Sequence, residues 1–175
     1  MLPPSGYWLS PIKGPTSQPI PVRSRAKNFM NGVKAFFDTN VLLYMYGGDQ
    51  SKQARAKELF RQYALAGRML LSTQVVQEFY AAGSRKLGMP HAKLRDATAA
   101  LLDCPLVIVG PSEITSAIQN EERYQISFWD GLILAAAESG GSEILFTEDL
   151  NDGQQYGAVL ARNPFRSTAS SSSTH

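Results

Sequence analysis

The amino-acid sequence predicts an α/β protein in which helices cover a parallel β-sheet. Short apolar runs alternate with helical patterns from residue 33 onwards. The runs are apolar at consecutive positions, so both faces of each strand are expected to be buried, as in parallel sheets. The chain has 175 residues, 43% of them hydrophobic and 18% charged, which suits one globular domain with tails.

The first part of the domain predicts two strands, each followed by two helices. The glycine pair 47–48 ends the short helix after the first strand, and Ser51 starts the next one. Ser72 or Thr73 caps the helix after the second strand, and Pro90 opens another. The expected elements are a strand over 33–37, helices over 39–46 and 51–65, a strand over 69–71, and helices over 73–87 and 90–102.

The second part repeats this alternation. Pro111 or Ser112 starts one helix, Ser127 caps another, and the glycine pair 140–141 ends the latter. The pattern for the last strand is weaker than the others. The expected elements are a strand over 106–109, a helix ending near 124, a helix over 128–139, and strands over 144–146 and 158–161.

Both ends of the chain lack the pattern of a folded core. Residues 1–30 contain six of the ten prolines without apolar periodicity, so we expect a disordered proline-rich tail. Met30 offers an alternative start, so this segment is either extra upstream sequence or a basic tail that contacts nucleic acid. We expect one domain over residues 31–166 and a disordered serine-rich tail over residues 167–175.

Charge is distributed unevenly along the chain. Residues 49–95 contain nine Lys or Arg against three acids, whereas residues 96–152 contain eleven acids and one Arg. This asymmetry indicates a basic surface for an anionic partner beside an acidic region for cations or a basic partner. For any single charge, a solvated helix face is the simpler explanation.

The remaining composition excludes several classes of protein. A single cysteine, Cys104, excludes an internal disulfide framework and a cysteine-based zinc cluster. No apolar run approaches the roughly 18 residues that suggest a membrane span. The first residues lack the apolar segment of a signal peptide, so we expect a cytoplasmic protein with no membrane partner.

Four carboxylates are expected near the carboxyl ends of the strands. Asp38 ends the first strand, and Asp149 follows the fourth. Glu78 lies on the second turn of the helix after the second strand, and Asp130 lies on the first turn of the helix capped by Ser127. Ligands of open α/β sheets bind outside this edge.

Each carboxylate also has a simpler explanation. Asp38 could cap the next helix, Asp130 could complement a helix dipole, and Asp149 could shape a turn. Glu78 could be an exposed helix residue. Together, however, four acids at one edge repel one another unless a cation neutralises them. Hard oxygen ligands without Cys or His favour Mg²⁺ or Mn²⁺, which suits phosphodiester hydrolysis.

A histidine acid–base pair for RNA cleavage is excluded, because the only histidines are His91 and His175, which lies in the expected tail. In its acidic motifs and their spacing, the chain resembles the PIN domain family, and within it the VapC-type toxins of bacterial toxin–antitoxin pairs. The matching stretches, which span residues 33–165, are "FFDTNVLLY", "STQVVQEFY", "SFWDGLILAAA", "LFTEDLNDGQ" and "NPF".

The resemblance implies a three-layer α/β/α fold with a five-stranded parallel sheet, and a Mg²⁺- or Mn²⁺-dependent endoribonuclease. It implies that the acidic quartet, defined as Asp38, Glu78, Asp130 and Asp149, binds the metal and is catalytic. Supporting positions beside these ligands are Asn40, Thr147 and, as a possible outer-sphere acid, Asp152.

Other classes of protein fit the sequence less well. A haloacid-dehalogenase-like phosphatase needs a second Asp two residues after the first, where this chain has Asn40. A response-regulator receiver needs an Asp directly after its third strand, and "LVIVGPSE" offers none there. The alternative among non-enzymes is a catalytically weak PIN-like module that binds RNA or acts as a scaffold.

The expected partners are an RNA substrate, a small antitoxin protein and a second copy of the chain. Beyond the resemblance, the homodimer rests on apolar residues in the helices over 51–95, which are more than one packed face is expected to bury. An antitoxin could block the acidic cleft with an Arg that pairs with the carboxylates. The apolar residues are Tyr63, Phe79, Tyr80, Leu87 and Leu94.

Overall fold

The computed structural model describes residues 32–166, and the expectations for the two tails lie outside these residues. The domain boundaries at residues 30 and 166 therefore stay predictions. In chain order the elements are β1 (Ala35–Phe37), α1 (Thr39–Tyr44), α2 (Gln50–Leu65), β2 (Met69–Ser72), α3 (Thr73–Arg85), α4 (His91–Leu102), β3 (Leu106–Val107), α5 (Pro111–Tyr124), α6 (Phe128–Ser139), β4 (Ile144–Phe146), β5 (Gln155–Tyr156) and β6 (Val159–Arg162).

The sheet has the strand order β3-β2-β1-β4-β6-β5. Five strands are parallel, with Phe36 of β1 opposite Leu70 of β2 on one side and opposite Leu145 of β4 on the other. The α/β class and the five parallel strands are confirmed. The strand count was wrong by one, because the two-residue β5 pairs antiparallel with β6 and makes a sixth strand.

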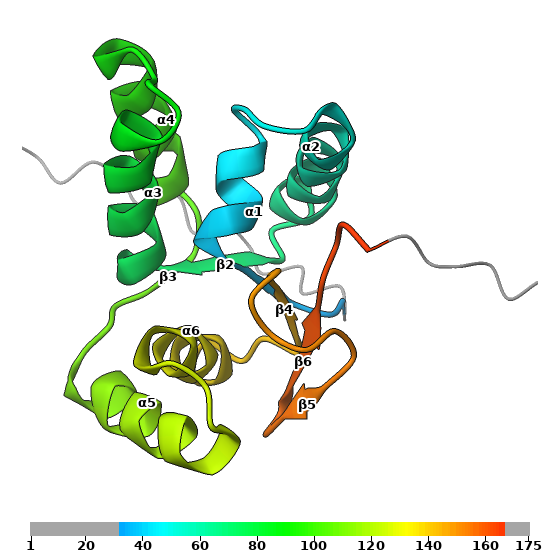
Figure 1. Ribbon diagram of the computed structural model, residues 1–175, viewed down its shortest axis with the longest axis vertical. Coiled ribbons are helices and arrows are strands. Elements are labelled where there is room, and N and C mark those ends of the chain that lie inside the picture. Colours follow the sequence, from blue (N-terminus) through cyan, green and yellow to red (C-terminus); the bar gives the residue numbers. More distant parts are fainter. Residues whose placement is uncertain (1–31, 167–175) are drawn as a thin grey trace, which may run out of the picture. The chain divides into compact units, whose positions relative to one another are not determined.

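The helices form two layers on opposite faces of the sheet. Helices α1 to α4 cover one face, and α5 and α6 cover the other, which gives the expected three-layer α/β/α arrangement (Figure 1). The central strands β1 and β2 are buried on both faces, with Phe36 and Leu71 fully inaccessible. Phe37 packs edge-to-face against Tyr63 and Phe146, with ring centroids 5.7 and 5.3 Å apart. Burial of these large apolar side chains is the main contribution to stability.

The helix boundaries are set by specific caps. Ser72 accepts a hydrogen bond from the Val75 N–H at 3.3 Å and caps α3, as its position in the sequence predicts. Helix α2 begins at Gln50, one residue earlier than expected, because Asp49 is its cap. The Asp49 carboxylate accepts from the N–H groups of Ser51 and Lys52 at 2.9 and 3.0 Å.

Helices α5 and α6 approach each other at a glycine. A Cβ at Gly131 would lie 2.6 Å from the carbonyl oxygen of Ala117, which is closer than real Cβ contacts. The Gly131 carbonyl also accepts a hydrogen bond of 3.1 Å from the Asn120 side-chain amide. Because Gly131 directly follows Asp130, this packing fixes the position of the first turn of α6.

The apolar residues that suggested a dimer surface are mostly core. Tyr63, Phe79 and Leu94 are buried, and only Tyr80 is exposed, at 40%. Leu87 is partly buried. The expectation that these residues form surplus surface was therefore wrong for Tyr63, Phe79 and Leu94. Tyr63 packs against Phe37 and Phe146, and Phe79 and Leu94 are buried where α3 packs between α1 and α4. Among residues 32–166, no helix is long and apolar enough to cross a membrane.

Candidate active site

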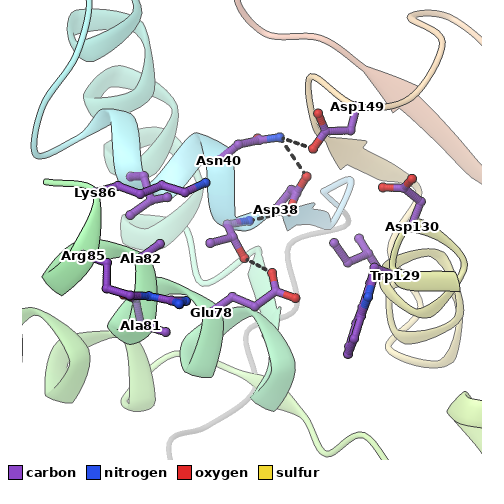
Figure 2. Close-up of a pocket in the computed structure, with 13 residues that line it drawn as sticks. Asp38, Asn40, Glu78, Ala81, Ala82, Arg85, Lys86, Trp129, Asp130 and Asp149 are labelled. Atoms are coloured by element: carbon purple, nitrogen blue, oxygen red, sulfur yellow. Dashed lines mark hydrogen bonds between the residues drawn. The ribbon is translucent and has the colours of Figure 1, made fainter. Parts of the chain in front are cut away.

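The acidic quartet lines one pocket at the carboxyl edge of the sheet (Figure 2). Asp38 follows β1 and Asp149 follows β4, and these two strands are adjacent at the point where the strand order reverses. Glu78 comes from α3 and Asp130 from α6, which lie on opposite faces of the sheet. The pocket has a volume of about 350 Å³.

Asp38 is the buried carboxylate of the pocket, with 4% of its surface exposed. It accepts hydrogen bonds from the Thr147 hydroxyl at 2.6 Å, from the Asn40 amide at 2.9 Å and from the Thr39 N–H. Burial raises the pKa of Asp38 to about 7; the Thr147 hydrogen bond opposes this, whereas the negative charge of Asp149 adds to it. Asp38 also caps α1, as the simpler explanation of this residue predicted.

Asn40 joins two carboxylates that are far apart in the sequence. Its side-chain nitrogen donates to Asp38 at 2.9 Å and to Asp149 at 3.0 Å. Thr147 completes the link, because its hydroxyl oxygen accepts from the Asp149 N–H at 3.1 Å while it donates to Asp38. Both side chains therefore hold carboxylates in place.

Glu78 is held by two side chains that the sequence did not single out. The Thr39 hydroxyl donates to one of its carboxylate oxygens at 2.8 Å, and the Gln74 amide donates to the other at 2.8 Å. Both donors are buried. Gln74 precedes Glu78 by one helical turn, so the spacing was visible in the sequence, whereas the contact with Thr39 depends on how α1 packs against α3.

Asp130 is fixed at the N-terminus of α6. Its N–H donates to the Ser127 hydroxyl oxygen at 3.1 Å, and that hydroxyl donates to the Asp130 carboxylate at 2.7 Å. Asp130 thus faces the pocket and also takes part in the capping of its helix. Asp149, the fourth carboxylate, is exposed.

Asp152 lies apart from this pocket. It does not line the cavity; it accepts a hydrogen bond of 3.0 Å from the Asn163 N–H and lies 3.9 Å from the Arg166 guanidinium. These contacts tie the loop after β4 to the end of β6. The outer-sphere role of Asp152 stays a prediction.

The donors around the pocket fit a hard divalent cation. Four carboxylates converge without any His or Cys, and the buried Asn40 Oδ1 has no hydrogen-bond partner among the described residues. Within residues 32–166, however, no three carboxylates approach closely enough to form a ready-made metal cluster. Hydrogen bonds from Asn40, Thr147 and Thr39 hold the acids instead.

Three further residues line the pocket that the sequence did not suggest. Arg85 and Lys86 come from the end of α3, and Trp129 comes from the first turn of α6. Arg85 and Lys86 lie seven and eight positions after Glu78, which places all three on one face of a helix. Trp129 directly precedes Asp130. These spacings from Glu78 and Asp130 are the features of the sequence that could have placed the three residues at the pocket.

The fold and the pocket together define a class of protein. The chain belongs to the PIN domain family, whose sequence profile matches residues 35–152. This confirms the resemblance drawn from the sequence motifs. A comparison with curated protein sequences finds no significant match.

Solved structures of toxin–antitoxin proteins share the fold. A toxin–antitoxin complex from Klebsiella pneumoniae has a TM-score of 0.56 at 20% identity, covering 75% of this chain and 98% of the other. Mycobacterium tuberculosis VapC20, a toxin that cleaves the sarcin–ricin loop, gives 0.55 at 18% identity and coverage of 66% and 90%. DNA-bound VapBC from Salmonella typhimurium gives 0.56 at 17% identity and coverage of 75% and 98%. The similarity lies in the fold.

Proposed function

We propose that this protein is a Mg²⁺- or Mn²⁺-dependent endoribonuclease that acts in the cytoplasm as the toxin of a toxin–antitoxin pair. The observation that carries the proposal is the convergence of four carboxylates, from four separate elements, on one pocket. Like charges brought together in this way repel one another and destabilise the fold unless a cation neutralises them. The PIN family membership and the toxin fold of the structural neighbours support this proposal.

The quartet, Asp38, Glu78, Asp130 and Asp149, would hold the cation. A divalent cation bound there supplies charge neutralisation for the scissile phosphate and a hydroxide nucleophile at neutral pH. The protein itself orients the carboxylates. Asn40 and Thr147 orient Asp38, Asn40 also orients Asp149, and Thr39 and Gln74 orient Glu78. Such fixed ligands reduce the reorganisation needed when an anionic substrate arrives.

The toxin assignment implies a protein partner and a dimer. Two of the structural neighbours are complexes of a toxin with its antitoxin. We infer a small antitoxin whose Arg side chain pairs with the quartet and blocks the pocket, and a homodimer as the active form. Tyr63, Phe79 and Leu94 are buried in the domain, so they are not available to the dimer interface.

Cleavage of RNA tests the proposal directly. The purified protein should cleave single-stranded RNA in Mg²⁺ or Mn²⁺ and stop in EDTA, and Asp130→Asn should abolish cleavage while the protein stays folded. Asp96→Asn is the matched control, because Asp96 is an exposed α4 residue outside the pocket. Expression should arrest bacterial growth unless the antitoxin is co-expressed.

Two outcomes would contradict the proposal in different ways. Cleavage that persists in EDTA and in Asp130→Asn would refute metal-dependent catalysis by the quartet. RNA binding without cleavage in any divalent cation would favour the alternative, a catalytically weak RNA-binding or scaffold module. Expression that leaves bacterial growth unchanged would refute the toxin role. A monomer in light scattering would refute the dimer.

A further inference from the structure

Trp129 is an exposed aromatic residue at the pocket that holds the quartet. Its side chain is 60% accessible, whereas the residues that follow Asp130 on α6 are all buried from Gly131 to Ala137. An indole left in water contributes little to the stability of the domain, since stabilisation scales with the apolar area buried. A core-packing role therefore does not account for Trp129.

The indole ring contacts the ring of the preceding residue. The Phe128 ring packs edge-on against it, with centroids 5.4 Å apart and an interplanar angle of 74°. Asp130, the next residue, is tied to Ser127 by two hydrogen bonds, so the turn that carries Trp129 is itself fixed. The indole therefore presents an exposed flat surface beside a carboxylate of the quartet (Figure 2).

The wall from α3 carries positive charge. Arg85 and Lys86 are exposed and line the same pocket (Figure 2). In the part of the chain that the structure describes, neither side chain forms an ion pair, and Arg85 donates only to the Ala81 carbonyl of its own helix. These cations are therefore available to an anionic ligand.

We propose that Trp129 stacks on an unpaired base of the RNA next to the cleaved phosphodiester, while Arg85 and Lys86 bind the phosphates that flank it. This inference rests on the proposed function and adds how that site holds its substrate. A nucleotide matches the three properties of the pocket, because it offers a flat aromatic base, anionic phosphates for the α3 wall and a phosphate for the quartet. Bases in a duplex are stacked on each other and cannot use the indole, so the pocket selects single-stranded regions.

Stacking can be measured without cleavage. A single-stranded RNA carrying one 2-aminopurine is titrated with the full-length Asp130→Asn protein at low salt in Mg²⁺, in which the proposed nuclease is inactive and the strand stays intact. The Trp129 and Tyr80 substitutions are made in this background. Binding should quench the 2-aminopurine fluorescence. Trp129→Ala should remove the quenching and weaken binding by about 5- to 100-fold, and Trp129→Phe should restore part of both. Tyr80→Ala is the matched control, because Tyr80 is an exposed aromatic on α3 that does not line the pocket.

Cleavage in Mg²⁺ then locates the base. An RNA with an abasic site beside the cleaved bond should react more slowly with wild-type protein, and Trp129→Ala should slow the abasic RNA no further, because the two changes remove the same contact. Arg85→Ala should reduce the slope of log affinity against log salt by about one.

The outcomes separate this inference from the proposed function. Quenching that depends on Trp129, without cleavage by wild-type protein in any divalent cation, would support the stacking site and refute the nuclease. Cleavage that is unaffected by Trp129→Ala would refute the stacking site and leave the nuclease standing. Loss of antitoxin binding in Trp129→Ala, with unchanged RNA binding, would assign the indole to the protein partner and overturn the inference.

Discussion

Replacing Asp38 with Asn should change how the stability of the metal-free protein depends on pH. In the folded protein, burial raises the pKa of Asp38 from 3.8 to about 7. Below pH 3.8 the carboxyl is protonated in both states and the effect is absent. As the pH rises towards 7, the unfolded chain ionises Asp38 while the folded chain retains the proton, so the wild-type protein loses stability.

The size of this loss follows from the two pKa values. The difference between 3.8 and about 7 corresponds to about 4 kcal/mol of unfolding free energy once both states are ionised. Asn has no ionisable group, so the Asp38→Asn variant should gain up to this amount relative to wild type. The variant also alters the hydrogen bonds from Thr39, Asn40 and Thr147. Their effect adds the same amount to the difference in unfolding free energy at every pH. The part of the difference that changes with pH therefore reports the ionisation of Asp38.

The assay is urea denaturation of both proteins in EDTA from about pH 4 to about pH 8.5. The difference in unfolding free energy should grow with pH and level off above the folded pKa. Asp96→Asn, which removes an exposed carboxylate, should show no such growth. Mg²⁺ added at the upper pH should reverse the order, because it stabilises the wild type by binding its carboxylates. A difference that is independent of pH would refute the argument that Asp38 is ionised at a cost in the folded state.

Three further predictions concern the residues that position the site. Gly131→Ala should destabilise the protein by about 1–3 kcal/mol, because the new Cβ meets the Ala117 carbonyl; an unchanged melting temperature would show that α6 can move away from α5. Asn40→Ala should lower both the cleavage rate and, by about 1–2 kcal/mol, the stability, since it removes the donor shared by two carboxylates; full activity would remove Asn40 from the site. Gln74→Leu should leave the free energy of unfolding within about 1 kcal/mol of wild type, because the lost hydrogen bond is offset by removal of a buried unpaired oxygen. It should slow cleavage, because Glu78 is no longer held; a large loss of stability with normal cleavage would contradict a positioning role for Gln74.

The sequence predicted those elements whose signals are local. Helix α6 begins after Ser127 and ends at Ser139, where a capping hydroxyl and a glycine pair lie. The strand β5 was missed because two residues carry no periodicity. Its pairing depends on a turn in which Gly157 has a φ of 58°, and its partner β6 had only a weak pattern of its own. The boundary of α2 was displaced by one residue because both Asp49 and Ser51 are residue types that favour the start of a helix, and the choice between them depends on backbone geometry.

The site was predictable only in part, for a related reason. Carboxylates that follow parallel strands must meet at one edge, so the quartet could be assembled from the order of elements. The contacts of Thr39 with Glu78 and of Asn40 with Asp149 join residues that lie 39 and 109 positions apart. They depend on β2 and β4 lying on either side of β1, and no local pattern encodes that order. The burial of Phe79 depends in the same way on the helices that pack around α3.

The central position of β4 has a consequence for synthesis on the ribosome. β4 pairs with β1 but is translated after β2 and β3. A growing chain can thus pair its first three strands while one side of β1 still waits for its neighbour. Until β4 emerges, Asp38 lacks the Thr147 hydroxyl and Asn40 lacks Asp149, 109 positions later. The complete pocket therefore cannot form at an early stage of translation. It forms only after β4 and the residues that follow it have left the ribosome.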